Sequence, residues 1–253
     1  MRGESYTMWK EELKIAIDTA RLAGNYLLEN WSLSSVTLSS KHKDIKLSGD
    51  IESENRILSY ISEHSRYPIL SEERGKNVEF DISDTTIYWI IDPIDGSLNY
   101  NRDIPLACVS IALWKGEKPL LGAIYDFNRD EMYSRIVGQK LVINEREIDL
   151  TDLIREKKDA VIATGFPSGR AYDDHSLMGF VKKVQEYKKV RLIGSAALSL
   201  AWVACGRIDA YSEDGIYLWD IAAGLALLGS SKYEVSKLPG TEYKYYVLAG
   251  NVS

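Results

Sequence analysis

The first part of the chain combines a helical and a polar pattern of side chains. Apolar residues recur at steps of three and four over residues 9–28, which predicts an amphipathic helix with a charged outer face. The same spacing returns over residues 50–61. The intervening residues 32–49 are polar and rich in Ser and Lys, so they predict a long exposed loop, and loops of that length are often functional.

Extended patterns follow these helices. Apolar runs at 68–70 and 87–91 are typical of strands covered on both faces. Two more runs, 107–114 and 120–125, are separated by Lys-Gly-Glu-Lys-Pro and predict an antiparallel hairpin. Residues 131–136 and 140–143 extend the same pattern. This part of the chain therefore predicts a series of strands that includes an antiparallel hairpin.

The order of predicted elements changes at the charged stretch 149–159. After this stretch, strands and helices alternate. The predicted strands are 160–164, 190–193, 208–212 and short ones near Glu234 and Tyr246, and the predicted helices are 177–184, 196–204 and 221–228. We expect an α+β fold with a boundary near residue 150: an N-terminal α+β half, residues 1–150, and a C-terminal α/β half, residues 151–253. No linker rich in Gly or Pro separates them, so the halves should pack as one body.

Composition narrows the class of protein. The 253 residues carry 31 Lys and Arg against 37 Asp and Glu, a net charge of -6, which argues against a general nucleic-acid binder. No apolar run approaches the roughly 18 residues of a membrane span, and the N-terminus lacks the apolar core of a signal peptide. Cys108 and Cys205 lie in apolar stretches without metal-ligand spacing, which favours buried, reduced thiols over the alternative of one disulfide. These features indicate a soluble cytoplasmic protein.

The most informative segment is the sequence Trp-Ile-Ile-Asp-Pro-Ile-Asp-Gly-Ser at 89–97, where a buried strand leads into a turn with two carboxylates three residues apart. Pro93 stiffens this turn and Gly96 permits close approach. Asp92, the Ile94 carbonyl and Asp95 can then converge on a cation that prefers oxygen ligands, such as Mg2+. An ordinary Asp/Gly turn after a strand is the alternative.

Two other acidic positions have simple structural explanations when taken alone. Glu72 and Glu73 follow a predicted strand, where an exposed acidic pair is common. Asp220 opens an apolar helix, where it can serve as the N-cap. The order and spacing of these acidic residues along the chain are what carry further information.

Together these motifs resemble the inositol monophosphatase family of Mg2+-dependent, lithium-sensitive sugar phosphatases, and within it the archaeal type that acts on inositol phosphates and fructose 1,6-bisphosphate. The resemblance covers nearly the whole chain. It rests on residues 89–97 and 217–224, supported by Ser71-Glu72-Glu73, by Asp50 before a helix and by Gly194-Ser195-Ala196-Ala197. Ser97 stands where Thr is frequent, and residues 39–49 diverge from the family pattern. The family implies an α/β/α/β/α layered fold with the active site between the halves, and a homodimer.

The resemblance also implies a cation site. Glu72, Asp92 and the Ile94 carbonyl would bind one Mg2+, and Asp92, Asp95 and Asp220 a second, with a third, weaker Mg2+ near Glu72; Mn2+ is an alternative metal. Ser97, hydrogen-bonded to Asp50 as base, would activate water, with Glu73 as a supporting partner. Ser97 can equally be a helix N-cap, and with Gly96 it would direct backbone N-H groups at phosphate.

Substrate contacts are expected from the second half of the chain. Gly194, Ser195, Ala196 and Glu213 match the family's contacts to a polyol, although Gly194 also fits a simple strand-to-helix turn. A second phosphate would require a cation, for which Arg191 and Arg170 are candidates, since guanidinium groups fit phosphate oxygens well. Exposed arginines that only meet solvent are the alternative for both.

Three functions follow from the residues and the resemblance. The leading one is a Mg2+-dependent phosphatase acting on a small phosphorylated sugar or polyol by direct attack of water. A 3'(2'),5'-bisphosphate nucleotidase shares the same metal motifs. A protein that retains the fold but acts by binding a partner is the third, and the complete acidic set argues against it, because crowded carboxylates are costly without cations.

Overall fold

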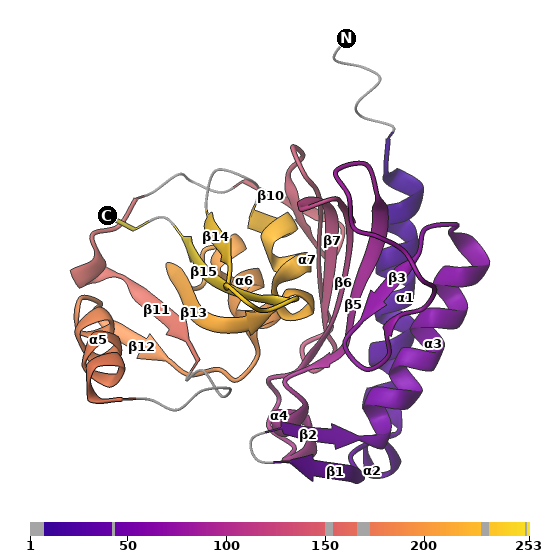
Figure 1. Cartoon of the computed structure of the whole chain (residues 1–253), viewed down its shortest axis with the longest axis horizontal. Coiled ribbons are helices and arrows are strands. Elements are labelled where there is room, and N and C mark those ends of the chain that lie inside the picture. The colour runs from indigo at the N-terminus through magenta and orange to yellow at the C-terminus, as the bar shows by residue number, and fades with distance from the viewer. Residues whose placement is uncertain (1–7, 42–43, 150–153, 166–172, 229–232, 251) are drawn as a thin grey trace.

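The computed structural model describes residues 8–41, 44–149, 154–165, 173–228, 233–250 and 252–253. These residues form five layers, alternately helical and sheet (Figure 1). The predicted layered α+β fold is therefore confirmed. The predicted boundary near residue 150 falls outside the described residues.

The first two layers come from residues 10–148. Helices α1 (Lys10–Glu29) and α3 (Ser48–His64) cover one face of an eight-stranded sheet of order β10-β9-β8-β7-β6-β5-β3-β4. Only the β3–β5 pair of this sheet is parallel. Its strands are β3 (Ile69–Ser71), β4 (Gly75–Lys76), β5 (Ile87–Asp95), β6 (Cys108–Lys115), β7 (Lys118–Asp126), β8 (Glu131–Ile136), β9 (Leu141–Ile143) and β10 (Arg146–Ile148).

The other three layers come from the second part of the chain. Helices α6 (Ala196–Ala204) and α7 (Leu218–Leu228) lie between the large sheet and a five-stranded sheet of order β12-β11-β13-β15-β14, and α5 (Asp174–Gln185) lies outside it (Figure 1). The strands of this sheet are β11 (Val161–Thr164), β12 (Lys189–Arg191), β13 (Ala210–Tyr217), β14 (Tyr233–Lys237) and β15 (Lys244–Gly250). In the described residues, no helix is both long and apolar enough to span a bilayer.

Strand β5 explains how the layers hold together. Its side chains alternate between the two faces of the sheet. Trp89 and Ile91 are buried in the core shared with α1 and α3, whereas Tyr88 and Ile90 are buried in the core shared with α6 and α7. The alternation therefore directs the next residue, Asp92, toward the layer that contains α7.

Close packing sets the position of α7. A Cβ atom on Gly122 of β7 would lie 2.5 Å from the Ala223 carbonyl oxygen, so only glycine allows this helix to approach the sheet so closely. Gly224 packs in the same way on Leu200 of α6, with its ideal Cβ 2.4 Å from the leucine Cβ. The first turn of α7 is thereby brought close to the end of β5.

The long periodic segments agree with the sequence predictions, but the loop predicted at 32–49 is wrong. This stretch contains the short helix α2 (Trp31–Ser34) and an antiparallel hairpin of β1 (Thr37–Lys41) and β2 (Asp44–Leu47). The hairpin has few buried residues, so no alternation of polar and apolar positions marks it. The described structure also adds β10, the short helix α4 (Ser97–Asn101) and a 3-10 turn, Lys157–Asp159. Both cysteines are free, as predicted, but only Cys108 is buried, whereas Cys205 is partly exposed.

Candidate functional site

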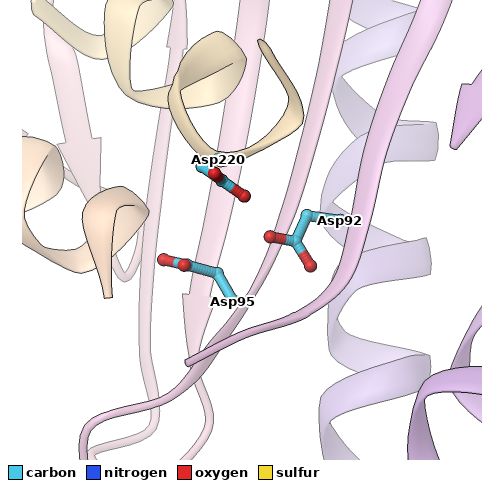
Figure 2. A group of neighbouring side chains, drawn as sticks. All are labelled: Asp92, Asp95 and Asp220. Atoms are coloured by element: carbon cyan, nitrogen blue, oxygen red, sulfur yellow. The ribbon is translucent and has the colours of Figure 1, made fainter. Parts of the chain in front are cut away.

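Three aspartates from two distant segments converge between the large sheet and α7. Asp92 and Asp95 come from the end of β5, and Asp220 from the first turn of α7 (Figure 2). One carboxylate oxygen from each lies within 4.8 Å of the others. The turn that carries the first two is irregular, because the β5–β6 pairing shifts register between Asp92 and Asp95. This irregularity lets both side chains face the same point.

The electrostatics of these carboxylates favour protonation or a cation. Burial raises the pKa of Asp92 well above its usual value, and the negative charges of Glu72 and Asp95 add to the effect. Burial and the charge of Asp95 likewise raise the pKa of Asp220. Three crowded oxygen donors suit a hard divalent cation such as Mg2+.

Asp95 is held by the N-terminus of α6. Its carboxylate accepts hydrogen bonds from the Ser195 hydroxyl and from the backbone N-H groups of Ala197 (2.7 Å) and Ala196 (3.4 Å). Burial raises the pKa of Asp95 to about 6, and the hydrogen bond from Ser195 counteracts part of this rise. Ser195 and Ala196, predicted to contact substrate, thus contact a predicted metal ligand.

Glu72 lies beside the three aspartates. Its backbone N-H donates to the Ile91 carbonyl of β5 (3.3 Å), and its carboxylate lies close enough to that of Asp92 for the two groups to interact. Glu72 is exposed as a residue, but protein atoms crowd its carboxylate, and this desolvation raises its pKa, with a further contribution from Asp220. The adjacent Glu73 forms an ion pair with Lys46 of β2.

Ser97 and Asp50 form a second feature of the site. The Ser97 hydroxyl lies 3.1 Å from Asp50 Oδ1 and 2.8 Å from the Ile94 carbonyl oxygen, both of which can accept its proton. Burial raises the pKa of Asp50 to about 7, opposed by a hydrogen bond from the Leu47 N-H (2.6 Å). Asp50 occupies the first turn of α3, so its predicted place before the helix is wrong. Asp220 is likewise inside the first turn of its helix, where it accepts from the Tyr217 N-H (3.1 Å).

The structure brings Gly96 and Gly194 together. Both have positive φ angles, of 91° and 74°, and a Cβ atom on Gly96 would lie 3.2 Å from the Gly194 carbonyl oxygen. Asn99 of α4 strengthens this junction by donating to the carbonyls of Leu106 and Ile193, each at 2.9 Å. The start of α4 and the turn before α6 therefore lie in contact with each other.

Glu213 of β13 lies close enough to Asp95 for their charges to interact. It accepts a hydrogen bond from Tyr211 (2.8 Å), and burial raises its pKa with a contribution from the charge of Asp95. Gly165 leaves room for it, since a Cβ there would lie 2.4 Å from the Glu213 carboxylate oxygens. Glu213 can therefore present a partly buried carboxylate to a ligand beside the aspartates.

The two predicted arginines have no described contact with the acidic cluster. Arg191, at the end of β12, is exposed and donates to the carbonyl of its neighbour Val190 (3.0 Å). Arg170 lies outside the described residues. The structure thus leaves both second-phosphate assignments as predictions.

Comparison with known proteins accounts for this arrangement. The model of the inositol monophosphatase family matches residues 8–252. The chain belongs to the inositol monophosphatase family. Membership supports a phosphatase activity.

Individual relatives in this family have different names. The chain is 35% identical over 232 residues to the inositol-1-monophosphatase of Mesorhizobium japonicum, covering 90% of this chain and 86% of that protein. It is 34% identical over 239 residues to the Nus factor SuhB of Xylella fastidiosa, covering 93% and 85%. The solved structure of inositol monophosphatase from Anabaena (Nostoc) has a TM-score of 0.79 and 34% identity over 97% of this chain and 92% of that one.

Two polar residues of this family member were missed by the sequence analysis. Ser53 and Glu54 are buried on the same face of α3 as Asp50, and each contacts a segment next to an acidic residue of the site. A signal for them exists in the sequence, because positions 50, 53, 54, 57 and 61 form one helical stripe. Polar residues at three positions of a stripe that also contains Ile57 and Ile61 indicate buried hydrogen bonds.

Proposed function

We propose that this protein is a Mg2+-dependent phosphomonoesterase that hydrolyses small sugar or polyol phosphates, inositol 1-phosphate and fructose 1,6-bisphosphate among them. One observation carries the proposal. One carboxylate oxygen from each of Asp92, Asp95 and Asp220 lies within 4.8 Å of the others, between the two halves of the chain. Their raised pKa values support it, because mutual repulsion of buried carboxylates is relieved when a divalent cation binds. Family membership supports the reaction class.

The proposed cation ligands form two overlapping sets. Glu72, Asp92 and the Ile94 carbonyl would hold one Mg2+, and Asp92, Asp95 and Asp220 another, with Mn2+ as a substitute and a third site near Glu72. When bound, these ions neutralise phosphate charge and lower the pKa of water. The oxygen-only donor set supports Mg2+, which prefers carboxylate and carbonyl ligands.

The proposed base is Asp50 acting with Ser97. The Ser97 hydroxyl lies within hydrogen-bond distance of Asp50, at 3.1 Å, so it can pass a proton to this carboxylate while orienting an attacking water. A pKa of about 7 suits a residue that takes up a proton near neutral pH. Glu73 would support the arrangement from the neighbouring turn, where Lys46 offsets its charge.

The proposed substrate contacts lie opposite this pair. Gly96 and Ser97 begin α4 and would face the phosphate, while Gly194, Ser195, Ala196 and Glu213 would face the polyol. Glu213 can accept two hydroxyl hydrogen bonds, which is the usual way a carboxylate recognises a sugar. Arg191 and Arg170 stay candidates for a second, uncleaved phosphate.

A homodimer is part of the proposal. The support is a group of exposed apolar side chains on α1, α2 and the segment around α4, namely Leu28, Trp31, Leu33, Leu98 and Ile104. Trp31 donates to the Tyr100 carbonyl (2.8 Å), so α2 and α4 adjoin, and Leu28, Trp31 and Ile104 line one shallow hollow there. Light scattering on the purified protein tests the oligomeric state. A cytoplasmic location and lack of nucleic-acid binding are further predictions.

Phosphate release from three substrates tests the activity. Purified protein is assayed with inositol 1-phosphate, fructose 1,6-bisphosphate and adenosine 3',5'-bisphosphate, in Mg2+ and in excess EDTA. We expect Mg2+-dependent release from at least one of the first two. Preference for the third compound would instead identify a bisphosphate nucleotidase, and release that persists in EDTA would exclude the metal mechanism.

Partner binding is a second candidate, favoured by the relative from Xylella fastidiosa that bears the name Nus factor SuhB. The cluster of three aspartates favours catalysis, since a protein acting only through its surface has no use for crowded, mutually repelling carboxylates. The two functions are compatible, and inactivity on all three substrates would leave partner binding as the better explanation.

A further inference from the structure

Helix α3 contacts three separate segments of the site through one face. Asp50, Ser53 and Glu54 are all buried on that face, at spacings of three and four residues. Asp50 accepts from Ser97 at the start of α4, as described above. The other two residues touch neither the aspartates nor the predicted substrate surface, so their burial calls for a different explanation.

Ser53 is bonded to the turn between the first two aspartates. Its hydroxyl donates to the Pro93 carbonyl oxygen at 3.1 Å, and Pro93 directly follows Asp92. This turn lies where β5 loses its regular pairing with β6, so the sheet alone does not fix it. The hydrogen bond from α3 supplies a restraint at that point.

Glu54 is bonded to the residue before Glu72. Its Oε1 accepts a hydrogen bond from the Ser71 hydroxyl, and Ser71 and Glu54 are each only 1% exposed. Arg74 Nε lies 2.8 Å from Oε2, close enough for an ion pair although not aligned as a hydrogen bond. Glu54 thus contacts both sides of the Glu72-Glu73 turn.

A buried glutamate is a costly way to stabilise a fold. Its desolvation is offset by one hydroxyl and by an arginine that is itself half exposed, and apolar residues of similar volume stabilise such positions at least as well. The geometry gives Glu54 another use. Ser71 directly precedes Glu72 and Pro93 directly follows Asp92, and the carboxyl groups of Glu72 and Asp92 are close enough to interact.

We propose that Ser53 and Glu54 are positioning residues that set the distance between Glu72 and Asp92. Both residues belong to α3, so their hydrogen bonds to Pro93 and Ser71 attach the two neighbouring segments to one rigid helix. The inference rests on the proposed function, since this distance matters when both carboxylates bind the same cation. Hydrogen bonds behind metal ligands generally tune affinity in this way.

Equilibrium binding of Mn2+ without substrate tests the proposal. Free Mn2+ is measured by electron paramagnetic resonance in titrations of the wild-type protein, Ser53→Ala, Ser71→Ala, Glu54→Ala, Glu54→Gln and the double variant Ser71→Ala/Glu54→Ala. Glu52→Ala is the matched control, because Glu52 lies on the exposed face of the same helix and pairs with Arg56 (3.0 Å). Circular dichroism and urea unfolding in EDTA verify that each variant is folded.

The expected results separate positioning from charge. Glu54→Ala should weaken Mn2+ binding about tenfold, and Ser71→Ala, which changes no charge, should weaken it severalfold. The double variant should bind no more weakly than Glu54→Ala, because both changes remove the same hydrogen bond. Glu54→Gln keeps an oxygen that accepts from Ser71, so it should bind more tightly than Glu54→Ala. At saturating Mn2+, these variants should lower kcat for inositol 1-phosphate with little change in KM.

Contrary results have distinct meanings. Wild-type Mn2+ affinity in Ser53→Ala and Ser71→Ala would overturn the positioning role while leaving the proposed function intact, as would equal affinities of Glu54→Ala and Glu54→Gln. Should Ser71→Ala or Glu54→Ala be unfolded, the comparison of Glu54→Gln and Ser53→Ala with the wild type decides. No saturable Mn2+ binding by the folded wild type would refute the proposed function, and the inference with it.

Discussion

The hydroxyl of Ser97 faces the Asp50 carboxylate across 3.1 Å, although the two residues are 47 positions apart and belong to different helices. We predict that Asp50→Asn lowers kcat for the best substrate by about 10²- to 10⁴-fold, the usual contribution of a general base. Steady-state kinetics at saturating Mg2+ measures this loss. Glu63→Gln, an exposed change at the other end of α3, is the control and should retain wild-type activity. A kcat of Asp50→Asn within threefold of the wild type would contradict the assignment.

Stability without metal should depend on pH in the opposite sense from most proteins. Asp50 and Asp95 have pKa values of about 7 and about 6 in the folded protein, above the ordinary value of 3.8. Between about pH 4 and pH 7 the folded state therefore binds more protons than the unfolded state, and the free energy of unfolding falls as pH rises.

Urea unfolding in EDTA from pH 4.5 to 7.5 measures this dependence. The fall should be smaller in Asp95→Asn, which cannot ionise at that position. Unfolding free energies that rise steadily over this range in EDTA would show that the buried carboxylates do not control the stability.

Removing one carboxylate should stabilise the protein without metal and reduce the further stabilisation by metal. We predict that Asp220→Asn raises the free energy of unfolding in EDTA, because it relieves repulsion with Asp95 while an amide oxygen can still accept from the Tyr217 N-H. The same variant should lose most of the increase in melting temperature that the proposed Mg2+ binding would give the wild type. Thermal unfolding with and without Mg2+ measures both. Full stabilisation of Asp220→Asn by Mg2+ would place the cation elsewhere.

The packing of α7 on the large sheet gives a test of the fold. We predict that Gly122→Ala lowers the free energy of unfolding by about 1–3 kcal/mol, because its new Cβ would lie 2.5 Å from the Ala223 carbonyl oxygen. Gly179→Ala is the matched control. Its Cβ meets nothing within 4 Å on exposed α5, so it should stabilise the protein by about 0.5–1 kcal/mol. Urea unfolding of both variants measures the difference, and a neutral Gly122→Ala would show that α7 can shift.

Local patterns predicted the main elements of the fold because apolar spacing is set by the faces each element buries. The run from Ile87 to Ile91 predicted a strand covered on both sides, and its end located Asp92 and Asp95. The hairpin within 32–49 escaped prediction, since its exposed side chains carry no alternation. The layering came from the resemblance to the family and not from periodicity.

The candidate site was less accessible to local reasoning. Asp220 read alone is a capping residue. The resemblance to the family gave it a predicted role as a metal ligand, and the fold brings it close to the other two aspartates. Ser53 and Glu54 were missed because their partners, Pro93 and Ser71, lie 40 and 17 residues away in the sequence. Contacts between distant segments depend on tertiary packing, which a single sequence does not encode in any local pattern.

The dependence of Asp95 on α6 affects how the protein matures on the ribosome. Its carboxylate receives the Ala197 N-H from 102 residues further along the chain. Translation delivers β5 long before α6 and α7, and a carboxylate without these donors is more stable in water than in the core. The tip of β5 should therefore stay hydrated in a nascent chain until α6 and α7 emerge, so that the proposed cation site is completed only after both helices have been synthesised.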